Sequence, residues 1–258
     1  MQELVRSHVK PEIQVFANPE ALTQAAATKF VRQANQAIQA RGRFTIALSG
    51  GSTPKSLYAL LATQPWRSQI PWKQVYPFWG DERHVLPSDP KSNFRMTQER
   101  LLFQVPIPHE NVHRIKAENP DAQAVAVKYE QELKQFFQLG AHQFSQFDLV
   151  LLGMGANGHT ASLFPNTDAV HEQSRLVVAS WVEELNTHRI TLTPPAINNA
   201  HEIIFFVTGE EKAAMLKAVL EGQYQPDRLP AQIIRPTQGK VIWMVDQAAA
   251  SSLSTAVL

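Results

Sequence analysis

The chain has no cysteine among its 258 residues, which excludes a disulfide framework, a thiolate nucleophile and any metal site with cysteine ligands. It has no excess of either charge, because 24 Lys and Arg stand against 23 Asp and Glu without a long run of one sign. We therefore expect neither a nucleic-acid partner nor an anionic membrane surface. No apolar run is long enough for a signal peptide at residues 1–11 or for a bilayer span. These absences predict a cytoplasmic protein that acts on a small molecule.

Short apolar runs alternate with helical stretches along the chain. Asn18-Pro19 predicts the start of a helix that ends at Arg41-Gly42, and a second long helix is predicted over 121–139. The alternation predicts an α/β fold with a doubly wound, mainly parallel sheet and helices on both faces. Because there is no repeat or linker, residues 1–258 are interpreted as a single domain. The predicted strands are 13–16, 44–48, 75–79, 147–152, 176–181, 189–192, 203–207 and 241–245.

One histidine lies shortly after a largely apolar predicted strand. The run over 147–152 is followed by Gly153, Gly155 and Gly158, and then by His159. Glycines allow the backbone to approach a ligand closely, and the segment after them is typical of a first helical turn, whose free N–H groups attract anions. Because open α/β sheets bind ligands at this edge, His159 is a candidate functional residue. A lone histidine is more often satisfied by the neighbouring backbone.

The segment from Ser49 to Pro54 follows the strand 44–48 and has the sequence Ser-Gly-Gly-Ser-Thr-Pro. Gly50 and Gly51 free the backbone to wrap an anion, while Ser52 or Thr53 can cap the next helix. The same pattern occurs in ordinary capped turns, so the residues alone leave both interpretations open.

Charged residues follow the strand 75–79 in the segment Trp79-Gly80-Asp81-Glu82-Arg83. Such clusters are usually solvated surface charges that contribute little to stability. Their position at a strand end instead favours a site that includes Asp81 and Arg83.

Two further cations, Arg189 and Lys212, are predicted at the start of a strand and early in a helix. A phosphate dianion requires cations of this kind. A lysine at that end of a helix is disfavoured by the helix dipole, and a bound anion would remove the penalty.

The segment from His109 to His113 fits the zinc-protease pattern H-E-x-x-H, which works only on a helix. Pro106 and Pro108 precede it, and the residues that follow have an extended pattern. We therefore expect no metal site here.

The segment 153–165, Gly-Met-Gly-Ala-Asn-Gly-His-Thr-Ala-Ser-Leu-Phe-Pro, resembles the signature of the 6-phosphogluconolactonases, within the group that includes the glucosamine-6-phosphate deaminases. The segments 49–54, 79–83 and Ser92-Asn93 also match. Asn157 departs from the pattern, since the family usually has aspartate there. The resemblance implies metal-independent, cofactor-free hydrolysis of 6-phospho-D-glucono-1,5-lactone to 6-phosphogluconate, the second step of the oxidative pentose phosphate pathway.

The resemblance also implies roles for individual residues. His159, with a pKa near its reference value of roughly 6.5, is the general base that takes a proton from water. Asp81 and Asn157 complete the catalytic group. The residues expected to hold the substrate and its phosphate are Gly50, Gly51, Ser52, Thr53, Arg83, Gly155, Arg189 and Lys212.

Two alternatives remain for the function. A glucosamine-6-phosphate deaminase would need a carboxylate a few residues after the histidine, where this chain has Thr160-Ala-Ser-Leu-Phe-Pro. A non-catalytic sugar-phosphate sensor of the transcription-regulator type would carry a DNA-binding unit before the first strand, for which we expect no room before Ile13. The sequence is compatible with a monomer and does not fix the oligomeric state.

Overall fold

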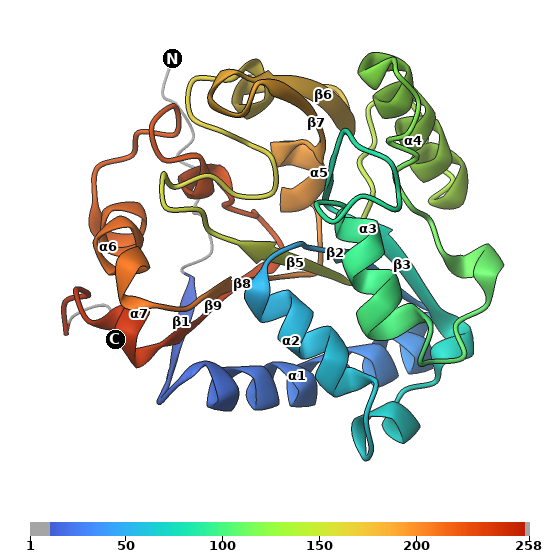
Figure 1. Cartoon of the computed structure of the whole chain (residues 1–258), viewed down its shortest axis with the longest axis horizontal. Helices are drawn as coiled ribbons and strands as arrows, with labels where there is room; N and C mark the ends of the chain where they lie inside the picture. Colours follow the sequence, from blue (N-terminus) through green and yellow to red (C-terminus); the bar gives the residue numbers. More distant parts are fainter. Residues whose placement is uncertain (1–10, 256–258) are drawn as a thin grey trace.

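The computed structural model describes residues 11–255, and a parallel sheet of six strands lies at its centre (Figure 1). The strands cross the sheet in the order β1-β9-β8-β5-β2-β3. Every residue of β2 and β8 is buried, as is usual for strands that are covered on both faces. The predicted parallel sheet is therefore confirmed. Its strands are β1 (Glu12–Phe16), β2 (Phe44–Leu48), β3 (Val75–Trp79), β5 (Leu149–Gly153), β8 (Glu202–Val207) and β9 (Lys240–Asp246).

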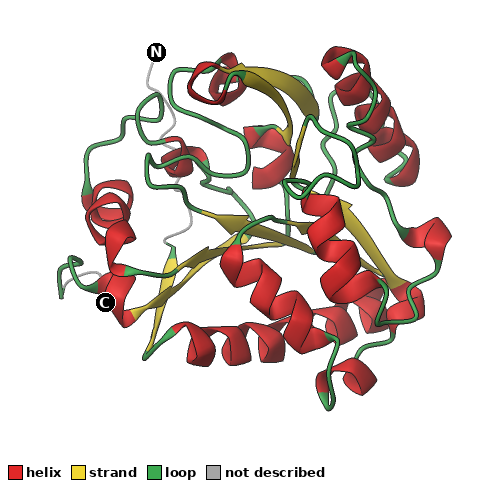
Figure 2. Cartoon of the chain, in the orientation of Figure 1, coloured by secondary structure: helices red, strands yellow, loops and turns green. Residues whose placement is uncertain are grey.

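Helices cover both faces of this sheet, as predicted. Figure 2 shows α1 and α2 below the sheet and α5 above it, with the labels of Figure 1. Within residues 11–255, no helix combines the length and the apolar content that are needed to cross a bilayer. The helices are α1 (Pro19–Arg41), α2 (Ser52–Leu61), α3 (Asn93–Thr97), α4 (Ala122–Phe136), α5 (Pro194–Asn198), α6 (Ala213–Glu221) and α7 (Gln247–Ala250).

The two long helices show how local sequence sets their ends. Helix α1 begins as predicted, because the Asn18 side chain accepts a hydrogen bond from the Ala21 amide, and it ends at Gly42 in a left-handed conformation. Helix α4 ends at Phe136, three residues earlier than predicted. Gln138 adopts a φ of 53°, and the Leu139 amide donates to the Lys134 carbonyl, which closes the helix.

A second, smaller sheet corrects the sequence-based picture. The predicted strands 176–181 and 189–192 form β6 (Val177–Val182) and β7 (Thr187–Leu192), which pair antiparallel with each other and not with the main sheet. A third strand, β4 (Asp81–Arg83), pairs antiparallel with β7. The sequence did not predict β4, because three consecutive charged residues carry no apolar pattern. This sheet carries Asp81, Arg83 and Arg189.

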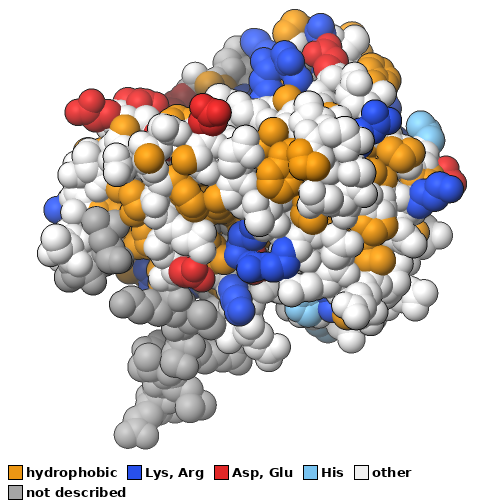
Figure 3. Space-filling model, turned by 90° about the horizontal axis from the view of Figure 1, so that it is seen from below, with side chains coloured by type: hydrophobic (Ala, Val, Ile, Leu, Met, Phe, Trp, Pro, Cys, Tyr) orange, Lys and Arg blue, Asp and Glu red, His pale blue; other side chains and the backbone are white. Residues whose placement is uncertain are grey.

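The charged surface residues are dispersed on the face shown in Figure 3, where Lys, Arg, Asp and Glu side chains form small separate groups among neutral and apolar surface. This pattern agrees with the formal net charge of +1.

The prediction about a signal peptide concerns the N-terminal segment, of which residues 1–10 lie outside the described residues.

Candidate functional site

The candidate segments meet at one edge of the main sheet. The glycine segment after β2, the charged segment after β3, the His159 loop after β5 and the turn before Lys212 all follow the carboxyl ends of parallel strands. In a parallel sheet these ends lie on the same edge, which is where open α/β sheets bind ligands. The topology therefore brings together residues that are as far apart in sequence as Gly50 and Lys212.

The loop that carries His159 is held by its own backbone. The Gly155 amide donates to the His159 carbonyl at 2.9 Å, and the Gly158 amide, with a φ of 78°, donates to the Gly155 carbonyl at 3.0 Å. The prediction that a helix begins at His159 is wrong. Instead, Thr160 pairs with Leu163 in a tight chain reversal, and the Thr160 hydroxyl donates to the Gly153 carbonyl at 2.8 Å.

The His159 imidazole has one nitrogen occupied and one available. Nδ1 lies 2.6 Å from Oδ1 of Asn157, and the same oxygen accepts the His159 backbone amide at 3.3 Å. A neutral imidazole that donates through Nδ1 keeps its lone pair on Nε2. Among residues 11–255, no side chain or backbone group forms a hydrogen bond with Nε2, so this nitrogen can accept a proton.

The surroundings of His159 keep it neutral. Burial and, to a lesser extent, the positive charges of Lys212, Arg189 and Arg83 together lower its pKa to about 4. The sequence-based value of roughly 6.5 is therefore too high. The same shift shows that the three predicted cations lie close enough to the imidazole to repel its protonated form. An imidazole with this pKa is neutral at pH 7 and can act as a base.

Two of these cations lie directly opposite each other. Arg83 on β4 pairs with Arg189 on β7 in the antiparallel ladder. Burial and the charge of Arg83 lower the pKa of Arg189, and Asp81 and Glu82 partly offset this effect. Like charges at opposed positions of a sheet destabilise it. A bound anion would relieve this repulsion, so the pair indicates an anion site.

Asp81 and Glu82 are buried, with 6% and 2% of their surface exposed, and this excludes the interpretation of a solvated charge cluster. Ser162 donates its hydroxyl to the Asp81 carboxylate at 2.7 Å, and the Asn93 side-chain amide donates to the Asp81 carbonyl at 3.0 Å. No hydrogen bond joins Asp81 to His159 within the described part of the chain. Asp81 acts on the charge of Arg189, and its catalytic role stays a prediction.

Glu82 has a structural function that the sequence did not indicate. Its carboxylate accepts the amides of Arg83, Asn93 and Phe94, each at 2.8 Å, and the Ser92 hydroxyl at 3.0 Å. It therefore closes the amino end of α3 and fixes the segment that follows β4. Burial raises the pKa of Glu82, and these hydrogen bonds counteract the effect.

The glycine segment after β2 leads into α2 as predicted, but the cap differs. Gly51, with a φ of 108°, is the N-cap, and Ser52 and Thr53 are the first two helical residues and not the cap. Gly50 is needed for packing, because a Cβ atom there would lie 2.1 Å from Oδ1 of Asn93. Thr53 contacts Thr208 through hydroxyl oxygens 3.1 Å apart.

Three residues of the site were missed by sequence reasoning. Ser162 holds Asp81, Thr208 contacts Thr53, and the Phe164 ring stacks on the His159 imidazole with centroids 4.2 Å apart. Thr208 follows the buried strand β8 and precedes Gly209, a position that resembles Ser49 after β2. This likeness is a signal that could have identified Thr208. No sequence pattern predicts the contacts of Ser162 or Phe164.

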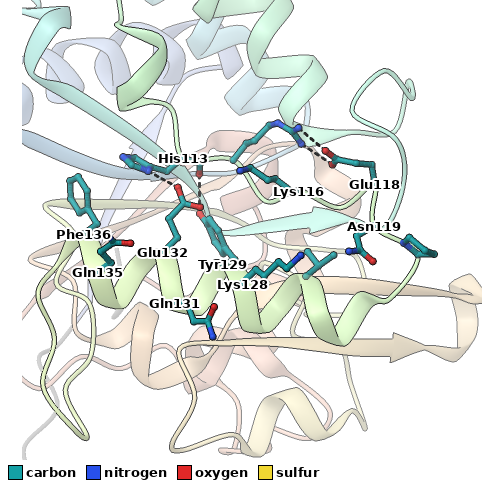
Figure 4. Close-up of a pocket in the computed structure, with 13 residues that line it drawn as sticks. His113, Lys116, Glu118, Asn119, Lys128, Tyr129, Gln131, Glu132, Gln135 and Phe136 are labelled. Carbon is teal, nitrogen blue, oxygen red and sulfur yellow. Dashed lines mark hydrogen bonds and ion pairs between the residues drawn. The ribbon is translucent and has the colours of Figure 1, made fainter.

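A groove of about 980 Å³ lies between the 113–120 segment and α4, and none of the predicted site residues lines it (Figure 4). His113 Nδ1 is 2.7 Å from a Glu132 carboxylate oxygen, and Arg114 donates two hydrogen bonds to Glu118 at 2.8 and 2.7 Å. Because the predicted cations act on His159 and none of them lines this groove, we place the chemistry at His159.

The backbone becomes extended within the H-E-x-x-H segment, at Val112, as predicted. Residues His109–Asn111 form a single 3₁₀ turn, Val112 is extended, and the His113 amide donates to the Pro77 carbonyl. His109 and His113 therefore do not share a helix face, which the zinc-protease pattern requires.

Comparisons with known proteins give a consistent result. The family model described as glucosamine-6-phosphate isomerases/6-phosphogluconolactonase matches residues 17–243. Relatives named 6-phosphogluconolactonase from Synechocystis sp. and Nostoc sp. are 41% and 40% identical, over 94% and 95% of this chain and 98% and 100% of their own. The solved structure of the 6-phosphogluconolactonase from Trypanosoma cruzi matches with a TM-score of 0.85 at 30% identity, covering 96% of this chain and 99% of that one.

Proposed function

Because this chain belongs to the glucosamine-6-phosphate isomerase/6-phosphogluconolactonase family, we propose that it hydrolyses 6-phospho-D-glucono-1,5-lactone to 6-phosphogluconate. This is the second step of the oxidative pentose phosphate pathway. The observation that supports it best is the geometry at His159, where Nδ1 lies 2.6 Å from Asn157 Oδ1, Nε2 has no hydrogen-bond partner among residues 11–255, and three cations help to keep the imidazole neutral.

The phosphate of the substrate binds to the cationic part of the site. Arg83, Arg189 and Lys212 supply the charge, and the segment from Gly50 to Thr53 lies at the same edge of the sheet. The phosphate does not change during the reaction, so these contacts orient the lactone ring by remote binding energy.

His159 acts as the general base on the lactone carbonyl. Nε2 takes a proton from a water molecule while the water oxygen attacks C1, which gives a tetrahedral oxyanion. The oxyanion collapses, the bond between C1 and the ring oxygen breaks, and the imidazolium returns its proton to that oxygen. The net change is addition of one water to one lactone. Because the Gly155 and Gly158 amides already donate within the loop, neither is available as an oxyanion donor.

Asn157 fixes the orientation of the base. Its Oδ1 accepts the Nδ1 hydrogen of His159, which selects the tautomer with a basic Nε2. It supplies no negative charge, unlike the aspartate that the family usually has there. The imidazolium formed during attack is consequently less stabilised, so we expect an active enzyme with a modest deficit.

The test is a coupled assay in which the lactone is generated from glucose 6-phosphate and the formation of 6-phosphogluconate is followed. The proposal predicts acceleration over spontaneous hydrolysis and no ammonia release from glucosamine 6-phosphate. No acceleration at protein concentrations that bind the lactone would overturn the proposal. Ammonia release would instead indicate the deaminase branch of the family.

A further inference from the structure

Phe164 is the aromatic side chain that lies against the candidate base. Its ring stacks on the His159 imidazole with centroids 4.2 Å apart and planes 21° apart, and 7% of its surface is exposed. The chain reversal between Thr160 and Leu163 brings position 164 back over position 159. The Thr167 hydroxyl donates to the Phe164 carbonyl at 2.8 Å, which anchors the end of the reversal.

The imidazole is restrained by two further contacts. A Cβ atom at Gly155 would lie 2.1 Å from both Cε1 and Nδ1 of His159, so the ring packs directly on the glycine backbone. Asn157 holds the Nδ1 edge through a hydrogen bond of 2.6 Å. One hydrogen bond leaves the ring free to tilt about the Nδ1–Oδ1 axis, whereas a stacked aromatic ring restricts this movement.

We propose that Phe164 is a positioning residue that holds the His159 imidazole in the orientation in which Asn157 binds Nδ1 and Nε2 stays free. The inference rests on the proposed function, because it assigns Phe164 an effect on the base of that reaction. Phe164 also covers part of the imidazole from water, and burial is the largest cause of the low pKa of His159.

The charged groups that act on His159 are Lys212, Arg189 and Arg83, and Phe164 does not contribute a charge. A change at position 164 therefore alters the water exposure and the orientation of the ring while the three cations remain. The two effects can be measured separately, as the proton affinity of the imidazole and as turnover.

The experiment compares Phe164→Leu, which keeps an apolar side chain without a ring plane, with Phe164→Tyr, which keeps the ring. We expect Phe164→Leu to lower kcat by roughly 10- to 100-fold, the usual cost of a misplaced catalytic group, with a smaller change in KM. Phe164→Tyr should restore most of kcat. Phe30→Leu is the control for lost core packing and should leave kcat unchanged, because this buried ring packs edge to face on Phe44 at the amino end of β2, opposite the edge that carries the site.

A readout that is independent of catalysis is the NMR signal of the His159 Cε1 proton in the free protein, assigned with His159→Gln. In Phe164→Leu the signal should lose its ring-current shift, and its titration midpoint should rise from about 4 towards roughly 6.5. Wild-type kcat in Phe164→Leu, or an unchanged titration together with a kcat loss that Phe164→Tyr does not restore, would overturn the inference. The proposed function fails on a different result, the absence of lactone hydrolysis above the spontaneous rate in the parent protein, and full activity of His159→Ala would overturn His159 as the base.

Discussion

At the scale of single residues, the chemistry of the site depends on which form of one imidazole is present. Burial and three nearby cations favour the neutral form of His159, and Asn157 selects its tautomer. The sequence identified both residues through their place after a buried strand. It could not give the pKa of His159, because the cations that lower it come from β4, β7 and the start of α6.

His159 should titrate far below the usual range of histidine in the free protein. Its pKa of about 4 means that the imidazole is neutral at pH 6 and becomes half-protonated only near pH 4. Binding of 6-phosphogluconate should raise the midpoint, because the phosphate offsets the charges of Lys212, Arg189 and Arg83. The measurement is an NMR titration of the Cε1 proton with and without 6-phosphogluconate. A midpoint near 6.5 in the free protein would contradict the described burial.

Replacing Asn157 by Asp should raise turnover. A carboxylate beside Nδ1 stabilises the imidazolium that forms during attack and makes His159 a stronger base. In a plot of kcat against pH, the acidic limb should move to higher pH, because the histidine then binds its proton more tightly. Asn157→Ala is the companion variant, which removes the hydrogen bond without adding charge and should lower kcat. If Asn157→Asp lowers turnover and leaves the limb in place, position 157 does not tune His159.

At the scale of elements, the loop between β5 and the 160–163 reversal decides where the base lies. The three glycines were expected to admit a ligand, yet Gly155 instead admits the imidazole itself. The sequence predicted the strand, the break and the position of His159, all of which depend on local pattern. The helix predicted after His159 did not form, since Ala161 adopts a φ of 48° and the chain reverses.

Gly155→Ala should impair catalysis by displacing the imidazole. The new Cβ would lie 2.1 Å from ring atoms of His159, so the ring or the loop must move, and we expect a loss in kcat of about 100-fold. Gly153→Ala, at the last residue of β5 directly before this loop, is the matched control, because a Cβ there meets nothing within 4 Å of it. Steady-state kinetics of both variants measure the difference. Equal activities would show that the contact between Gly155 and His159 has no part in turnover.

The opposed arginines of β4 and β7 should favour ligand binding over stability. Arg189→Gln removes one of two facing positive charges, so we expect KM to rise by at least about tenfold while Tm stays unchanged or rises. Thermal unfolding with and without phosphate gives the second measurement, since phosphate should stabilise the parent protein more than the variant. A fall in Tm without any change in KM would mean that Arg189 is a structural residue.

At the scale of the whole molecule, the fold was predictable where burial alone determines it. Short runs of apolar and β-branched residues such as 44–48 and 203–207 predict buried strands, and they form β2 and β8. The small sheet was not predictable, because the pairing of β4 with β7 depends on two segments more than 100 residues apart in sequence. This pairing brings Arg83 to Arg189. The segments of the site were predicted, whereas their mutual contacts were not.

The most direct test of this account is the lactonase turnover of His159→Ala beside that of the parent protein at neutral pH, corrected for spontaneous hydrolysis. The loss of a positioned general base lowers kcat by about 10²–10⁴-fold. Binding of 6-phosphogluconate, which depends on Arg83, Arg189 and Lys212, should change little. Turnover close to that of the parent protein, in a folded variant that still binds 6-phosphogluconate, would contradict the assignment of His159 as the base.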